Sequence, residues 1–305
     1  MRKLYIIATA LAALCISANA SAQALPFVAS DHSAASMAKG SASYTDISNT
    51  SYAAFQSPAA MTFSQETMEI SFEYMLWQPS QVKTNIINAA GMLKLKDKFG
   101  IAAGVSYGMS PLYNITDIYG NTSKTFRPVQ KEFSAGFSWR FHKNISIGTN
   151  VGYANSKLTE DVSYSAVVAD IQTMAVFGNL KASLGISDLG TDITSASGLK
   201  FSLPTSVNLA AGYNIVLADK HCLCADAVAQ YYFTQDFAAA LGASYTYNGI
   251  LSFRTGYRYG GDSVIPSFAS VGAGVKVGGI KIDFAYLFGS KVLTNSMCIS
   301  VGYSF

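Results

Sequence analysis

The sequence predicts an all-β protein, a transmembrane antiparallel β-barrel of about fourteen strands with an N-terminal plug segment. Three observations predict this class. Only 13% of the 305 residues are charged, and 50% are hydrophobic. Past the N-terminus no uninterrupted apolar run reaches the roughly 20 residues that a spanning helix needs. Apolar side chains instead alternate with small or polar ones, and turn residues recur about every ten positions.

Residues 1–22 have the pattern of a secretory signal peptide. Arg2 and Lys3 precede an apolar stretch, and Ala20-Ser21-Ala22 supplies small residues for cleavage near Ala22. Cleavage removes two positive charges from a formal net charge of only +3. The nearly neutral mature chain has no concentrated basic patch, which disfavours nucleic acid as a partner.

Residues 23–65 differ in composition from the rest of the chain. They are rich in Ala and Ser, and no strand of barrel length is evident in them. Apolar side chains such as Phe27, Met37 and Phe55 need a surface against which to bury. We therefore expect this segment to lie in the lumen as a plug; a periplasmic tail is the alternative.

Residues 66–305 are expected to form the barrel. In the closing stretch from Ile299 to Phe305, every odd position is large and apolar and every even one is Ser or Gly. A soluble β-sandwich also alternates, but its outward face would carry many more charges than this chain has. A miscounted strand would give twelve or sixteen. The predicted strands are 66–77, 85–95, 99–109, 131–141, 144–155, 165–177, 180–187, 203–217, 222–233, 236–247, 250–259, 267–277, 280–288 and 297–305.

The joins between these strands predict the orientation of the barrel. The even-numbered joins are short, and Asn248-Gly249 and Gly278-Gly279 are strong hairpin turns. They are expected at the periplasmic rim, with the longer odd-numbered joins outside. Prolines fall at strand ends rather than in strand centres, so no break in the barrel wall is predicted.

Charged residues on the second face of the strands are expected to point into the lumen. Charges inside a barrel are paired or hydrated. We expect salt bridges that fasten the plug to the wall; a polar track for solute is the alternative. Arg254 and Arg258 lie about 13 Å apart by strand rise and are not expected to clamp one small anion. The set comprises Glu69, Glu73, Glu132, Arg140, Asp226, Arg254, Arg258, Lys281 and Asp283.

No catalytic constellation, cofactor site or metal site is predicted. His32, His142 and His221 fall in the N-terminal segment and in two turns, where histidines are usually solvated. After signal cleavage three cysteines remain, Cys222, Cys224 and Cys298, and their role stays open. The expectation is a non-enzymatic protein.

The C-terminus resembles the assembly signal of outer-membrane barrels. Phe305 ends an alternating strand and follows Tyr303 on the same face. Both are expected to serve insertion into the bacterial outer membrane.

Two N-terminal stretches, Ser33 to Tyr44 (SAASMAKGSASY) and Tyr52 to Ala60 (YAAFQSPAA), resemble the PorV/PorQ family within the wider FadL-like group. Later stretches add to the likeness, among them Leu203 to Tyr213 and the closing residues. Ala38-Lys39-Gly40 stands where that family usually has two glycines. The resemblance implies a fourteen-stranded outer-membrane barrel and an accessory role in type IX protein secretion.

Two functions follow as hypotheses. In the first, the barrel binds secretion-machinery or cargo proteins through the 110–130 loop, because large aromatics are preferred interface anchors. In the second, it is a FadL-like channel for hydrophobic small molecules, which needs an apolar pocket near the outer rim and a gap or kink in the wall. The absence of a predicted wall break favours the first. The partner-loop residues are Leu112, Tyr113, Ile115, Ile118, Tyr119 and Phe126.

Overall fold

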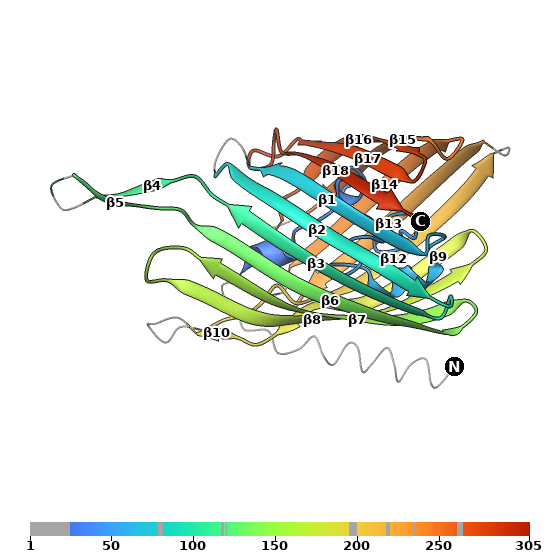
Figure 1. Ribbon diagram of the computed structural model, residues 1–305, viewed down its shortest axis with the longest axis horizontal. Coiled ribbons are helices and arrows are strands. Elements are labelled where there is room, and N and C mark those ends of the chain that lie inside the picture. Colours follow the sequence, from blue (N-terminus) through green and yellow to red (C-terminus); the bar gives the residue numbers. More distant parts are fainter. Residues whose placement is uncertain are drawn as a thin grey trace.

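Fourteen strands among the described residues of the computed structural model close into one antiparallel barrel (Figure 1). The structure describes residues 25–305 except 79–81, 117–118, 120, 195–199, 218–219, 235 and 261–264. The predicted signal peptide, residues 1–22, lies outside the described residues. Among those that are described, no helix is both long and apolar enough to cross a membrane.

The fourteen predicted strands are confirmed, with ends that shift by a few residues. The barrel strands are β1 (Met68–Trp77), β2 (Thr84–Leu95), β3 (Phe99–Met109), β6 (Val129–His142), β7 (Ile145–Lys157), β8 (Ser163–Phe177), β9 (Leu180–Gly190), β12 (Ser206–Leu217), β13 (His221–Tyr232), β14 (Phe237–Tyr247), β15 (Leu251–Tyr259), β16 (Phe268–Val277), β17 (Ile280–Phe288) and β18 (Met297–Ser304). Each pairs with its neighbours in sequence, and β1 pairs with β18 to close the barrel.

The period of two sorts side chains between the two faces of the wall. Along β1, Ile70, Phe72 and Tyr74 point outward, whereas Glu69 and Glu73 are buried inside. The same sorting places large apolar side chains on the outside of each of the remaining barrel strands. The charged residues of β15 and β17 all face inward.

The two ends of the barrel differ in their connections. One end, here the turn end, holds the short turns 96–98, 143–144, 178–179 and 278–279 together with the C-terminus. The other, the loop end, carries two small hairpins, β4 (Tyr113–Thr116) with β5 (Thr122–Phe126) and β10 (Ile193–Thr194) with β11 (Lys200–Phe201). The 110–130 loop is thus partly an extended hairpin that projects from the rim (Figure 1).

The last residue completes the seam of the barrel. The Phe305 backbone N–H donates to the Met68 carbonyl at 2.9 Å, and the Thr67 N–H donates to the Phe305 carbonyl at 2.7 Å. The Phe305 and Tyr303 rings lie edge to face on the outer surface, with centroids 4.4 Å apart. Both side chains are exposed there, at the turn end.

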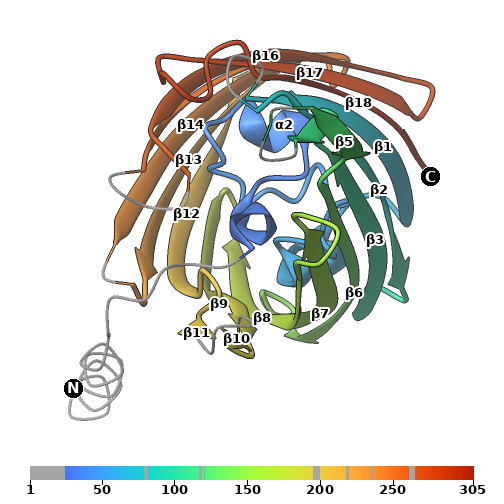
Figure 2. The same cartoon turned by 90° about the vertical axis from the view of Figure 1, so that its left-hand side faces the viewer.

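Residues 25–65, hereafter the N-terminal segment, run inside the barrel (Figure 2). They contain three short helices, η1 (Pro26–Ala29), α2 (Ala34–Met37) and η2 (Pro58–Phe63). Small residues allow close contact with the wall: a Cβ on Gly256 would collide with the Lys39 backbone. Pro58 at the first position of η2 has the expected place for helix initiation.

Candidate functional site

An apolar cavity of about 580 Å³ opens inside the loop end. Its walls come from η1, from the ends of β1 and β2, from the β4–β5 hairpin and from residues 265–266. None of the described residues that line it carries a charge at neutral pH. They are Pro26, Phe27, Ser30, Trp77, Gln78, Val82, Thr84, Ile86, Ser110, Tyr113, Ile115, Phe126, Pro128, Gln130, Ser156, Leu158, Thr159, Ile265 and Pro266.

Apolar clusters continue below this cavity into the barrel. Trp77, Ile86 and Ile265 belong both to the cavity and to a buried cluster that surrounds Met37 of α2. Phe27 of η1 packs on a second cluster, formed by Leu25, Val28, Ala154, Ala166, Val168, Ile193 and Leu203. These two clusters thus extend the apolar surface of the cavity toward the N-terminal segment.

The predicted partner-loop residues divide between the cavity and the outer surface. Tyr113, Ile115 and Phe126 line the cavity. Leu112 and Tyr119 are 54% and 83% exposed, and Ile118 lies outside the described residues. An ion pair of 3.0 Å from Lys124 to Glu160 joins the hairpin to the β7–β8 loop. Half of the predicted apolar anchors thus form the wall of a cavity.

Lys39 is the centre of a buried ion network at the other end of the lumen. Its ammonium group is 2.6 Å from Asp46 of the N-terminal segment and 3.1 Å from Asp226 of β13. Thr45 also donates to Asp226, at 2.9 Å. Burial works to raise the pKa of Asp46, but Lys39 and Lys181 outweigh it and hold that pKa well below its usual range. The carboxylate therefore stays charged and bound.

Hydrogen bonds from β6, β7 and β8 satisfy the irregular backbone of the N-terminal segment. Ser134 donates to the Ala54 carbonyl at 2.5 Å, and Ser146 donates to the Ala59 carbonyl at 2.7 Å. Gln172 donates to the Tyr44 carbonyl at 3.0 Å. Buried backbone without regular structure needs such partners, which gives these small polar side chains a reason to face inward.

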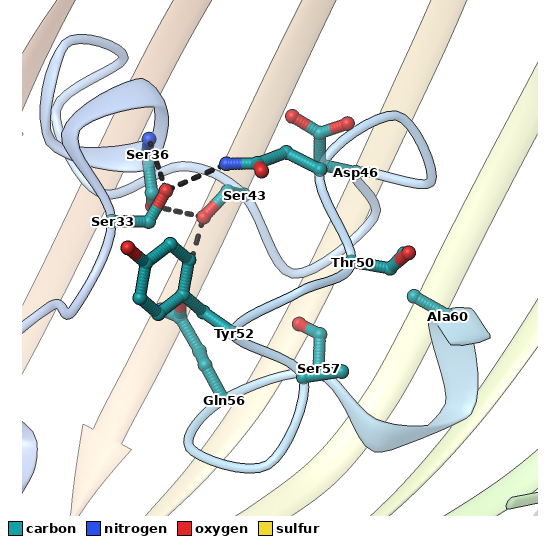
Figure 3. Close-up of a pocket in the computed structure, with 11 residues that line it drawn as sticks. Ser33, Ser36, Ser43, Asp46, Thr50, Tyr52, Gln56, Ser57 and Ala60 are labelled. Atoms are coloured by element: carbon teal, nitrogen blue, oxygen red, sulfur yellow. Dashed lines mark hydrogen bonds between the residues drawn. The ribbon is translucent and has the colours of Figure 1, made fainter. Parts of the chain in front are cut away.

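A small polar pocket of about 20 Å³ lies between the turns of the N-terminal segment (Figure 3). Asn49 donates to Ser33 at 2.7 Å, and Ser36 is hydrogen-bonded to Ser43. Ser43 in turn donates to Gln56 at 3.3 Å. The pocket has room for about one water molecule, so these side chains mainly hold the turns of the segment together.

The predicted lumen charges do not gather in one cluster, and each has a partner close by. Lys281 is 3.2 Å from Glu69, which also accepts from the Thr50 hydroxyl at 3.0 Å. Arg254 is 2.6 Å from Asp283. The remaining placements are Glu73 with Asn88 at 3.1 Å, Arg258 with the Tyr232 hydroxyl at 3.1 Å, and Arg140 over the Phe63 ring at 5.4 Å.

A second cavity, of about 350 Å³, opens at the turn end and is called the vestibule here. Lys39, Lys181 and Arg254 are among its lining residues, as are the free thiols of Cys222 and Cys224. In the described part of the chain, no group of three His, Cys, Asp or Glu side chains is placed to hold a metal ion. The vestibule thus differs from the loop-end cavity, whose described lining residues carry no charge.

His32 departs from the expectation of a solvated histidine. It is 5% exposed, stacks on Phe55 with ring centroids 4.1 Å apart, and lies 3.5 Å from the Glu132 carboxylate. The expectation is wrong because the N-terminal segment around it is packed inside the barrel.

The wall is irregular at β9, although its sequence predicts no break. The register of β8 against β9 shifts between Ala169 and Ile171, and Asp188 adopts a left-handed φ of 58°. The Asp188 N–H donates to the Asp170 side chain at 2.8 Å, and the Asp188 carbonyl accepts from Thr205 at 2.7 Å. Side chains take the place of strand partners here, so the bulge needs no proline.

The structure also identifies residues that the sequence did not single out for function. Phe27, Trp77 and Ile265 line the apolar cavity from three distant parts of the chain. One sequence feature could have identified Lys39 as a functional residue, because it is a lone charge among small residues. The partner of Lys39 on β13 could not be identified from spacing.

Comparisons with known proteins identify the fold. No family model and no curated protein sequence matches the chain. Among solved structures, the toluene transporter TodX of Pseudomonas putida has a TM-score of 0.64 at 14% identity, over 94% of this chain and 99% of that one. The toluene transporter TbuX of Ralstonia pickettii has a TM-score of 0.62 at 11% identity, over 90% and 98%.

A FadL homologue of Pseudomonas aeruginosa has a TM-score of 0.52 at 11% identity, over 94% of this chain and 99% of that one. These likenesses show the FadL-like barrel fold, the wider group named by the sequence resemblance. They lend no support to its PorV/PorQ branch or to a role in type IX secretion. TodX and TbuX are named as toluene transporters, and another similar structure, CymD, is named as a monoaromatic hydrocarbon channel.

Proposed function

We propose that the chain is an outer-membrane channel for uncharged hydrophobic small molecules. The observation that carries this proposal is the loop-end cavity, which is large enough for a small organic ligand and has no charged side chain among its described lining residues. The names of similar structures support the same class of ligand, since two are called toluene transporters and another a monoaromatic hydrocarbon channel.

The outer surface supports the membrane location. Most outward-facing side chains of the strands are apolar, and aromatic residues such as Phe99, Trp139 and Tyr303 lie near strand ends, as in the interfacial girdles of outer-membrane barrels. With the long loops outside, the apolar cavity faces the medium from which a ligand would arrive. A cleaved signal peptide at residues 1–22 would direct the chain to this membrane.

The N-terminal segment is proposed to act as a plug. It occupies the lumen below the cavity and is tied to the wall by Lys39 and by the Ser134, Ser146 and Gln172 hydrogen bonds. The charged vestibule beyond it is a poor path for an apolar molecule, because leaving an apolar surface for a charged one gains nothing. Straight passage down the lumen is therefore disfavoured.

The β9 bulge offers a sideways route into the membrane. Asp188 disturbs the wall beside the apolar cluster of Val28, Val168 and Leu203, on which Phe27 packs. Phe27 also lines the cavity. An apolar ligand could thus pass from the cavity, along Phe27 and this cluster, to a weakened part of the wall without contacting the ion network.

The cavity gives the hairpin aromatics a role that needs no protein partner. Tyr113, Ile115 and Phe126 are needed to enclose it. Docking of a secretion partner on Leu112 and Tyr119, which are exposed, is the second proposal. A pull-down from solubilised outer membranes distinguishes the two: a bound hydrocarbon supports the channel, and a co-purified secretion component supports docking.

A matched pair of substitutions tests the channel directly. Ile115→Glu places a charge in the wall of the cavity, and Leu112→Glu places the same charge at an exposed position just before the same hairpin. We expect Ile115→Glu to lower uptake of toluene about tenfold, the effect of about 1.4 kcal/mol, because a hydrated carboxylate in the wall leaves less apolar surface for toluene and resists desolvation. Leu112→Glu should change uptake less than twofold. Equal effects of the two changes would contradict the assignment of the cavity.

A further inference from the structure

The outer wall carries an apolar groove of about 260 Å³ over β1, β2 and β3. Its floor is a row of small outward residues, in which Gly91 lies opposite Ala103 and Ala103 lies opposite Ala135. The next row toward the turn end is bulkier, with Leu93 opposite Ile101. The groove therefore has a floor and raised edges, and it faces the lipid in the proposed membrane location.

Three exposed lysines cluster at the end of the same strands. Lys96 and Lys98 lie in the β2–β3 turn, and Lys143 lies in the β6–β7 turn. The two turns are neighbours, because the Arg140 N–H donates to the Lys98 carbonyl at 2.7 Å. The acidic residue of the first turn, Asp97, is bound by Lys94 at 3.0 Å. The lysine cluster thus keeps its positive charge.

Lysines are densest at this part of the rim. The short turns 178–179 and 278–279 are made of Gly and Asn and carry no charge, and the described part of the β12–β13 turn adds the single exposed Lys220. The cluster also lies just beyond a pair of outward aromatic residues, on their turn-end side, since Phe99 pairs with Trp139 in adjacent strands. Aromatic girdles mark the boundary of the hydrocarbon, so the lysines are at the depth of lipid headgroups.

The groove and the lysines fit within one membrane leaflet. Ile101, at the edge of the groove, is three residues from Lys98, which is about 10 Å along a strand. This is less than half of the roughly 30 Å hydrocarbon thickness. A single lipid could therefore lie with its headgroup at the turns and an acyl chain in the groove.

We propose that this surface binds an anionic phospholipid of the periplasmic leaflet. Its phosphate group would contact Lys96, Lys98 and Lys143, and one acyl chain would fill the groove between Leu93, Ile101 and Ala103. Charge complementarity selects an anionic headgroup, and the groove selects a lipid over a soluble phosphate. The inference rests on the membrane location within the proposed function, but not on the ligand of the loop-end cavity.

The test is native mass spectrometry of the full mature chain, purified in detergent with equal amounts of dioleoylphosphatidylglycerol and dioleoylphosphatidylcholine. We expect the wild type to retain one phosphatidylglycerol at least tenfold in preference to phosphatidylcholine. Lys96→Gln with Lys98→Gln and Lys143→Gln should remove the preference. The matched control, Lys83→Gln with Lys131→Gln and Lys291→Gln, removes three exposed charges toward the loop end and should retain it.

The groove is tested separately by Ala103→Leu, which fills its floor on the lipid-facing side. This change should lower phosphatidylglycerol retention severalfold, whereas Ala225→Leu, at an outward alanine of β13, should not. Soluble glycerophosphate should not compete. Equal retention of both lipids by the wild type, or loss in both lysine triples alike, would overturn the proposal. Toluene uptake by Ala103→Leu should stay normal, so failure of this site and failure of the channel are distinguishable.

Discussion

The loop-end cavity and the turn-end vestibule lie at opposite ends of one lumen and have different linings. The first encloses about 580 Å³ among apolar and neutral polar side chains, and the second about 350 Å³ among paired charges. The same N-terminal segment contributes Phe27 to the first and Lys39 to the second. Charged side chains hold the segment beside the vestibule, whereas the described residues that line the loop-end cavity carry no charge.

The difference follows from what each cavity must do. Buried ion pairs add little net stability over apolar packing, but breaking one is costly, so they fix a segment in one position. An apolar cavity gains affinity for apolar ligands from desolvation and offers few directional bonds. The vestibule therefore suits anchoring, and the loop-end cavity suits binding of a molecule that must leave again.

Deleting Phe305 should have the largest effect, because it removes the last residue of the turn-end seam and the proposed assembly signal. We expect most of the protein to fail to insert, measured as the heat-modifiable folded fraction in outer membranes. Deleting Tyr119 from the loop-end hairpin is the control and should leave insertion normal. Normal insertion without Phe305 would remove the assembly role from this residue.

Lys39→Met should destabilise the attachment of the N-terminal segment by about 3–5 kcal/mol, since it leaves Asp226 buried without its cation. Release of the segment can be measured by protease cleavage within residues 25–65. Lys124→Met breaks an exposed pair at the loop end and should cost less than about 1 kcal/mol. Adding Asp226→Asn to Lys39→Met should recover part of the loss. Similar effects for the two lysines would refute a special role for the vestibule network.

Two glycines with nearly the same positive φ separate close packing from backbone strain. Gly40 (φ 68°) would place a Cβ 2.8 Å from the Tyr257 nitrogen, whereas Gly249 (φ 67°) has open space around it. Gly249→Ala should cost about 1 kcal/mol and Gly40→Ala about 2–3 kcal/mol, measured by urea unfolding. Equal costs would mean that the N-terminal segment does not press on β15 at this point.

The pH dependence of the segment should be smaller and confined to acid. The folded pKa of Asp46 is depressed by Lys39 and Lys181 against the opposing effect of burial. Its contribution to stability is therefore complete above the unfolded value of about 3.9 and is lost as the pH falls below it. Burial raises the pKa of Asp31 in the same segment, so its protonation favours the folded segment as the pH falls. Protease cleavage of the segment should therefore not rise between pH 7 and 5, and should rise only below about pH 4. A rise at neutral pH would contradict this.

Much of the barrel could be predicted from sequence because a local sequence pattern specifies each strand. Alternation and turn residues identify each strand, and the closing Ile299 to Phe305 stretch does so without help from the rest of the chain. The sites could not be predicted in the same way. Lys39 and Asp226 meet across 187 positions, and the cavity joins Phe27, Trp77 and Ile265. The β9 bulge depends on the contact between Asp188 and Asp170. No turn residue in the sequence indicates this bulge.

The most direct test of the channel uses the two tryptophans of the chain. Trp77 lines the cavity and Trp139 faces outward at the turn end. In Trp139→Phe, bromobenzene should quench Trp77 saturably, and 4-bromobenzoate should need at least a tenfold higher concentration because its charge has no counterion there. In Trp77→Phe, Trp139 should show only the linear quenching of partition into detergent. Equal affinity for the two compounds, or linear quenching of both tryptophans, would contradict a cavity for uncharged hydrophobic molecules.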